Sequence, residues 1–250
     1  MRALLLVLAL SLGAACGDHA AIDPLAQLET DPDRMLAAAQ PTYKATYDSS
    51  TTWSASVYRG VPQPPVTRHM MTVVYAARPP DFRWDLTYDD NLPTRYNVIA
   101  HARGGEYCMN APGPTACYVL EPDLMEFWIQ ALTDSPWEAY RNVIRDMDAT
   151  VLPREHIAGR DAACFRWTSR KPLPSRTIDD SFEGCFDSNG VVLRATADHL
   201  DMRDEFRAVS TSDRVGDADF ALPYTLRAGP WPTWTPQPVP SSTVAPTPTR

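Results

Sequence analysis

The chain has 250 residues, of which 44% are hydrophobic and 22% charged, and these values exclude a wholly disordered or collagen-like chain. Its formal net charge of -8 argues against a nucleic-acid partner, because nucleic-acid binding depends on neutralising phosphates with lysine and arginine. Once two unusual ends are set aside, about 200 residues remain, enough for one sizeable core. We therefore expect one folded domain with no nucleic-acid partner.

Residues 1–15 have the pattern of a signal peptide. Arg2 precedes an apolar run over residues 3–12, and small residues then lead to Cys16; this is the order of a secretory signal and its cleavage site. The run is too short to span a bilayer, which needs about 20 residues. Its end resembles a bacterial lipobox, which implies a lipid attached to Cys16 and makes residues 16–24 an anchor and short linker. The alternative is ordinary secretion with an incidental cysteine.

Five cysteines indicate two disulfides and one cysteine with another role, for which Cys16 is the candidate. Cys108 and Cys117 flank a Pro-Gly-Pro turn and so face each other across a hairpin, while Cys164 and Cys185 lie in two strand-like segments joined by a polar loop. We predict these two bridges, which imply an oxidising exterior. The spacings do not suit zinc, whose structural sites usually pair cysteines about two to four residues apart, so we expect no metal.

A short helix is expected over residues 30–39, because Thr30 and Asp31 offer a cap and Pro32 suits the first helical position. Between residues 43 and 120, apolar and polar side chains alternate along several segments. An alternation with period two predicts β-strands. This part of the chain is therefore expected to form a sheet.

Residues 122–144 break the alternation. Leu124, Trp128 and Leu132 recur at three- and four-residue spacing, which predicts an amphipathic helix. The alternation returns between residues 163 and 208. Because strands come before and after the helices rather than between them, we predict an α+β fold with a mainly antiparallel sheet and helices on one side.

Residues 229–250 are rich in proline, threonine and serine. Such a composition cannot bury a core and favours extended polyproline geometry. We expect this tail to be disordered.

The aromatic residues of each predicted strand share one face. Phe82 and Trp84 alternate with Arg83 and Asp85, and the four paired cysteines have the parity of the polar residues. The apolar face would lose roughly 2 kcal/mol for each ring left in water, so something must cover it. Two coverings are open: ordinary core packing, or a cavity that takes an apolar guest.

Several segments, in this order, resemble the LolA and LolB lipoprotein-localisation carriers: residues 78–85, 97–99, 105–107, 187–193 and 219–223. The resemblance extends over about residues 25–225, and LppX- and LprG-like lipid-binding lipoproteins share the fold. It implies an incomplete antiparallel β-barrel, open like a half-pipe, with a helical lid over an apolar cavity that receives acyl chains.

On this resemblance and the shared parity, we expect the cavity to be lined by eight side chains and closed by three from the lid. The lining residues are Phe82, Trp84, Leu86, Tyr96, Val98, Tyr107, Phe165 and Trp167, and the lid residues are Leu124, Phe127 and Trp128. The sequence has no nucleophile elbow, zinc-protease motif or phosphate-binding glycine loop. We therefore expect neither an enzyme nor a cofactor.

Taken together, these patterns predict an exported lipoprotein anchored to the outer face of a bacterial cell membrane through Cys16. Residues 25–228 would bind a lipid or an acylated protein, as a monomer acting as carrier or sensor. The alternative is a non-catalytic regulatory or interaction module of the same fold whose core is filled.

Overall fold

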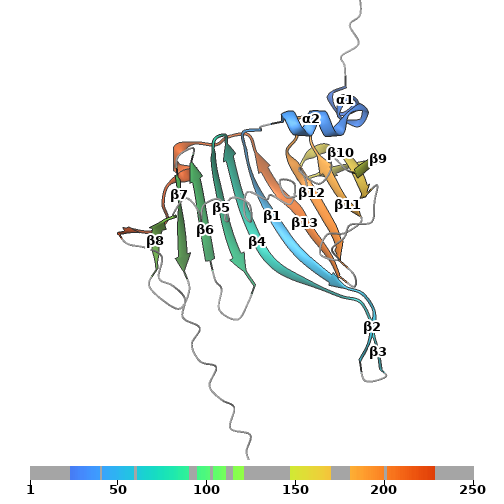
Figure 1. Ribbon diagram of the computed structural model, residues 1–250, viewed down its shortest axis with the longest axis horizontal. Coiled ribbons are helices and arrows are strands. Elements are labelled where there is room, and N and C mark those ends of the chain that lie inside the picture. The colour runs from blue at the N-terminus through green and yellow to red at the C-terminus, as the bar shows by residue number, and fades with distance from the viewer. Residues whose placement is uncertain are drawn as a thin grey trace, which may run out of the picture.

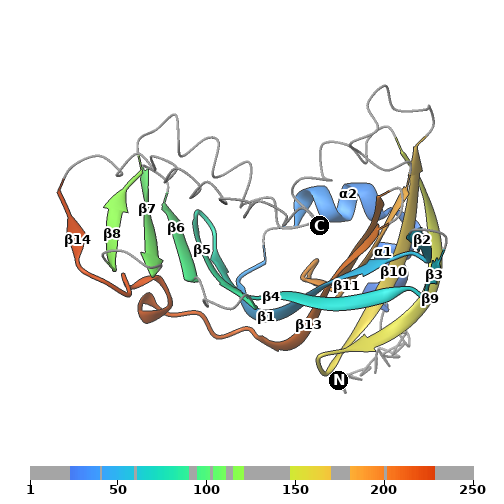
Figure 2. The same cartoon turned by 90° about the horizontal axis from the view of Figure 1, so that it is seen from below.

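The computed structural model describes residues 23–39, 41–58, 61–89, 95–101, 104–110, 115–120, 147–169, 181–199 and 202–228. Most of them belong to one 12-stranded sheet that curves into a trough (Figures 1 and 2). The predicted signal peptide, Cys16, the helix at 122–144 with Leu124, Phe127 and Trp128, and the tail at 229–250 lie outside the described residues.

The sheet is antiparallel almost throughout, as predicted, and β1 lies near its middle. β1 pairs with β4 on one side and with β13 on the other, and the one parallel pair among the described strands is β14 with β8. The spatial order is β14 (Leu226–Arg227), β8 (Ala116–Val119), β7 (Gly104–Asn110), β6 (Arg95–His101), β5 (Asp81–Tyr88), β4 (Val66–Arg78), β1 (Tyr43–Trp53), β13 (Met202–Ser212), β12 (Val192–His199), β11 (Ser181–Phe186), β10 (Arg160–Ser169) and β9 (Met147–Ile157).

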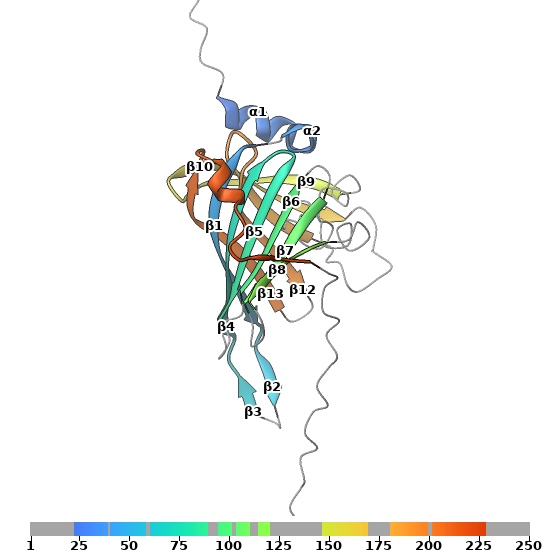
Figure 3. The same cartoon turned by 90° about the vertical axis from the view of Figure 1, so that its left-hand side faces the viewer.

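The long hairpin of β1 and β4 extends beyond the sheet. Its tip forms a separate two-stranded sheet of β2 (Ser56–Tyr58) and β3 (Val61–Gln63). This tip projects from the end of the molecule opposite the helices (Figure 3).

Two short helices, α1 (Pro24–Thr30) and α2 (Pro32–Ala38), lie on the concave side of the trough (Figure 2). Asp31 caps α2, with Oδ1 accepting from the Arg34 backbone N–H at 3.3 Å, and the expected helix is confirmed. Asp23 caps α1 in the same way, accepting from the Leu25 N–H at 3.0 Å. Since α1 begins at Pro24, the last residue of the segment interpreted as a linker is already helical.

The predicted parity of the strands is confirmed by the register. Trp84 on β5 lies opposite Tyr75 on β4 and Val98 on β6, and Val98 lies opposite Tyr107 on β7. Residues directly opposite in a sheet share a face. We call this face, which continues through Phe165 and Trp167 on β10 to the helices, the inner face.

Two elements differ from the sequence prediction. Strand β9 was not predicted, because most of its residues between the two buried ends are exposed and show no alternation; such a charged strand is typical of a sheet edge. The segment 219–223 resembles the closing strand of the LolA-like carriers, but residues Asp217–Phe220 form a 3₁₀-helix, η3. That helix belongs to a connection crossing the outer face, not to the sheet.

This connection runs from β13 to β14 across the outer, convex side of the sheet (Figure 2). Phe220 packs there with Ala76 and Ile99. The Arg83 guanidinium donates to the carbonyls of Asp219 and Ala221 at 3.1 and 2.7 Å. Side chains on the outer face thus bind the β13–β14 connection, and this connection does not cover the inner face.

The carboxylate of Asp219 gives a pH test of this attachment. It accepts from the backbone N–H of Gly216 at 2.9 Å and pairs with Lys44 at 2.6 Å, and these contacts hold the pKa of Asp219 below its usual value. Asp219→Asn should therefore lower the free energy of unfolding at neutral pH by about 1 kcal/mol.

The sign of this effect follows from the lowered pKa. The stabilisation is present above the unfolded pKa of about 4 and is lost as the pH falls through the lower folded value, so variant and wild type should converge in acid below that folded value. Urea unfolding at neutral pH and at a series of acidic pH values measures this. Asp217→Asn is the matched control, because Asp217 is 95% exposed and should show a smaller difference. An Asp219→Asn effect that persists undiminished in acid would contradict the attachment.

Candidate functional site

The inner face carries aromatic rings on β1 and on β4 to β7, and these rings contact one another within two groups. The ring centroids of Tyr75 and Trp84 are 4.5 Å apart, those of Tyr43 and Tyr75 are 5.2 Å apart, and those of Tyr96 and Tyr107 are 5.8 Å apart. These spacings are those of aromatic pairs in contact. The alternation along each strand, which is a local property of the sequence, is what places the rings on one face.

Six of the eight predicted lining residues belong to the apolar cluster that contains these rings, and their exposure differs. Trp84, Val98 and Tyr107 are buried, and burial raises the pKa of Tyr107 above its usual value, as expected in a medium of low polarity. Phe82, Leu86 and Tyr96 are only half-buried, although they pack against the same cluster. Apolar surface therefore remains uncovered on the concave side of the sheet.

The other two lining residues, Phe165 and Trp167, lie in a second cluster. Both are fully buried against Leu25, Leu28 and Leu36 of the two helices. The indole Nε1 of Trp167 donates to Asp33 Oδ1 at 3.2 Å. The structure thus divides the predicted set into an open group on β5 to β7 and a packed group beneath α1 and α2.

An arginine on the edge strand fixes the position of α1. Arg154 on β9 forms two hydrogen bonds with Glu29, at 2.6 and 2.9 Å, and an ion pair with Asp23 at 2.8 Å. The hydrogen bonds from Arg154 hold the pKa of Glu29 below its usual value. Sequence analysis did not identify Arg154, because its partners are more than a hundred residues away.

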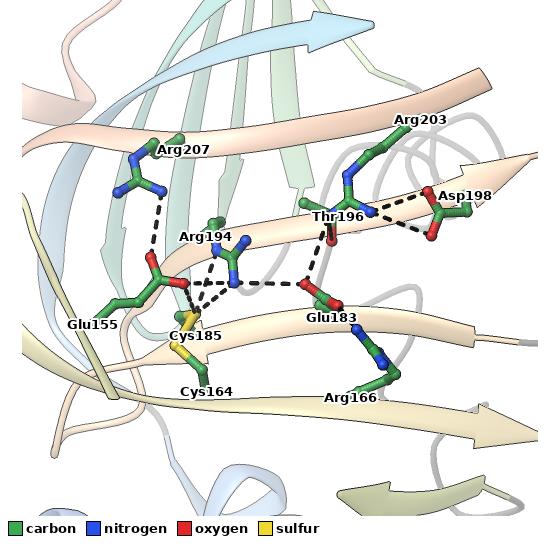
Figure 4. A network of polar contacts seen from close by, with 10 residues as sticks. All are labelled: Glu155, Cys164, Arg166, Glu183, Cys185, Arg194, Thr196, Asp198, Arg203 and Arg207. Atoms are coloured by element: carbon green, nitrogen blue, oxygen red, sulfur yellow. Dashed lines mark hydrogen bonds and ion pairs between the residues drawn. A yellow bond between two sulfur atoms is a disulfide. The ribbon is translucent and has the colours of Figure 1, made fainter. Parts of the chain in front are cut away.

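On the outer face, charged side chains cover the Cys164–Cys185 disulfide (Figure 4). Arg194 lies 2.8 Å from Glu155, 3.6 Å from Glu183 and 3.4 Å from Cys185 Sγ. Burial raises the pKa of Glu183, but the hydrogen bond from Arg166 and the charges of Arg166, Arg194 and Arg203 outweigh it, so the pKa is lowered. Each carboxylate of this network is paired with at least one arginine, which is typical of a structural role.

Both predicted disulfides are present, and both lie on the outer face between directly opposed residues of neighbouring strands. The carboxylate of Glu155 lies near the Cys164 and Cys185 sulfurs, within 4.8 Å, in the manner of a metal-ligand group. Because the two sulfurs are bonded to each other, they offer no thiolates there.

Removing the Cys164–Cys185 bridge should destabilise the domain. The bridge closes a loop with a sequence separation of 21, so Cys164→Ala with Cys185→Ala should lower the free energy of unfolding by about 3 kcal/mol. Urea unfolding of the oxidised proteins measures the loss. The Arg194→Lys variant, which keeps both cysteines and the positive charge, should lose clearly less; equal losses would mean that the charged network, not the bridge, carries the effect.

A second group of charges lies where the β11–β12 turn meets β10. Arg160 donates to Asp187 Oδ2 at 2.5 Å, to Asp213 at 2.6 Å and to Thr211 at 2.8 Å. Asp187 Oδ1 also accepts the backbone N–H groups of Asn189 and Val191, both at 2.9 Å. Arg160, Asp187, Asn189 and Asp213 are among the residues that line a polar depression of about 470 Å³. Arg160 and Asp187 form their hydrogen bonds within this group of residues, which indicates that the group stabilises the β11–β12 turn.

Among the residues that the structure describes, no helix has the length and apolarity needed to cross a membrane.

No protein-family model and no curated protein matches the chain. Among solved structures it is similar to MucB, with 16% identity and a TM-score of 0.46 over 78% of this chain and 62% of that one, so it spans less than two thirds of MucB. It is also similar to lipoprotein LppX from Mycobacterium tuberculosis, with 12% identity and a TM-score of 0.39 over 77% and 97% of the two chains.

A third similar structure is LprF from Mycobacterium bovis, with 10% identity and a TM-score of 0.37 over 79% of this chain and 96% of that one. This similarity includes LppX, one of the proteins whose fold the sequence resembles. At these identities and TM-scores, the similarity describes the fold and assigns no ligand or partner to this protein.

Proposed function

We propose that this protein is an exported lipoprotein whose inner face binds an acyl chain, belonging to a lipid or to an acylated protein, as a carrier or sensor. The observation that carries the proposal is the partly exposed apolar surface of Phe82, Leu86 and Tyr96 on the concave side of the sheet. Apolar surface in water is costly, at about 25 cal/mol per Å². A bound hydrocarbon chain would remove that cost.

The energetics suit such a ligand. Each buried methylene contributes about 0.8 kcal/mol, so a long acyl chain gains about 10 kcal/mol from a suitable apolar face without any contact to its head group. In our proposal Trp84, Val98 and Tyr107 form the floor, and Phe82, Leu86 and Tyr96 contact the chain. Phe165 and Trp167 close the site where α1 and α2 pack, and Leu124, Phe127 and Trp128 would cover it from the segment at 122–144.

The location follows from the chain's own residues. Two disulfides favour an oxidising compartment, and the lipobox-like end of residues 1–15 supports attachment through Cys16 to the outer face of a bacterial membrane. Residues 25–228 are the proposed acyl-binding domain, acting as a monomer.

A direct titration tests the proposal. A soluble version starting after Cys16 is mixed with a fluorescent fatty acid whose emission rises in apolar surroundings, and palmitate is then added as a competitor. We expect saturable binding that palmitate reverses. No rise in emission at any protein concentration would refute acyl binding and favour the alternative, an interaction module with a filled core, which the tight packing of Phe165 and Trp167 already favours for that end of the sheet.

A further inference from the structure

Among the residues that the structure describes, a buried polar atom of Trp84 on the inner face has no hydrogen-bond partner. The Trp84 side chain is only 6% exposed, and its indole Nε1 is completely buried without any hydrogen-bond acceptor. An indole nitrogen can only donate, and leaving a buried donor unpaired costs about 1–3 kcal/mol. Buried polar groups are nearly always paired, so an exception requires a physical reason.

The surroundings of Trp84 explain why no protein group pairs with it. Across the sheet it faces the side chains of Tyr75 and Val98, and Leu86 is its neighbour on the same face. A trapped water would need two to four polar partners, and these neighbours are mainly apolar. Other buried donors are paired: Trp167 donates to Asp33 at 3.2 Å and the Tyr47 hydroxyl to the Val192 carbonyl at 2.8 Å.

We propose that ligand entry opens the packing around Trp84 and that its Nε1 then donates a hydrogen bond to a carbonyl oxygen of the ligand, so that the inner face selects an acyl ester or amide over a plain hydrocarbon. This inference rests on the proposed acyl-binding function and adds the ligand's chemical class. An acyl chain carries such an oxygen at its head. Phe82 and Leu86 lie two residues to either side of Trp84, about 7 Å along the strand, and offer the apolar surface along which the chain would leave the carbonyl.

The test compares two ligands that differ in the acceptor, methyl palmitate and hexadecane, each displacing the fluorescent fatty acid from the soluble protein. Trp84→Phe keeps a ring but removes the N–H. We expect this variant to bind methyl palmitate about 3- to 10-fold more weakly and hexadecane with unchanged affinity. Trp53→Phe, the same substitution at the far end of β1, is the matched control and should behave as wild type.

A second readout does not depend on the stability of the variant. In the ¹⁵N-labelled wild-type protein, the indole resonance assigned to Trp84 should move downfield with methyl palmitate and not with hexadecane. If both ligands bind and Trp84→Phe weakens them equally, or the resonance does not distinguish them, the inference is wrong while acyl binding stands. If neither ligand binds the wild-type protein, the proposed function itself fails.

Discussion

Replacing Trp84 by arginine should abolish acyl-chain binding. The substitution places a guanidinium beside Tyr75 and Val98 in the apolar cluster of the inner face. An unpaired charge in apolar surroundings costs several kcal/mol, and a loss of about 3 kcal/mol corresponds to a reduction in affinity of about 100-fold. Titration with the fluorescent fatty acid measures the change.

The matched control is Thr87→Arg. Thr87 lies on the same strand but has the opposite parity, so its arginine would point to the outer face and should leave binding unchanged. Circular dichroism and thermal unfolding show whether Trp84→Arg folds. If it does not, Leu86→Arg serves instead, because Leu86 is half-buried on the same face. Acyl binding that survives arginine at both inner positions would contradict the proposed site.

Replacing Asp187 by alanine should cause the largest loss of stability, about 3–5 kcal/mol in the free energy of unfolding. The Asp187 side chain is 6% exposed, pairs with the largely buried Arg160 at 2.5 Å and accepts two backbone N–H groups of the β11–β12 turn. Removing it leaves a desolvated guanidinium short of one partner and two N–H groups without acceptors. Urea unfolding followed by circular dichroism measures the loss.

Asp213→Ala provides the matched comparison, because Asp213 pairs with the same Arg160 at 2.6 Å but is 71% exposed. Exposed ion pairs contribute about 1 kcal/mol or less, so this variant should remain close to wild type. If the two alanine variants lose equal stability, burial does not determine the strength of this ion pair, and the structural interpretation of the polar depression is wrong.

The inner face could be predicted from the sequence because parity is a local property. Phe82, Trp84 and Leu86 alternate with charged neighbours, and any strand with that pattern presents them together. The disulfides were predictable for a related reason, since Cys108 and Cys117 flank a turn that brings them opposite each other.

Contacts between distant segments could not be predicted in this way. Trp167 donates to Asp33 across 134 positions and Arg83 to Asp219 across 136, and no periodicity links such partners. The helix α1 is a different case. Asp23 and Pro24 repeat the signal of Asp31 and Pro32, so the same capping rule would have found it.

The division of the predicted lining set is also a tertiary effect. Phe165 and Trp167 have the same strand pattern as Phe82 and Trp84, yet the first pair is buried under α1 and α2 and the second belongs to the cluster with exposed apolar edges. The docking position of α1 and α2 decides which part of the apolar face these helices cover. Here Arg154, with Glu29 and Asp23, holds α1 at the β9 edge.

Mass spectrometry of small molecules extracted from the protein purified out of bacterial membranes would test acyl binding most directly, with the Trp84→Arg variant purified in parallel. We expect acylated molecules that bear an ester or amide carbonyl to be extracted with the wild-type protein and not with the variant. A wild-type protein that carries no more extractable acyl material than Trp84→Arg would contradict acyl binding.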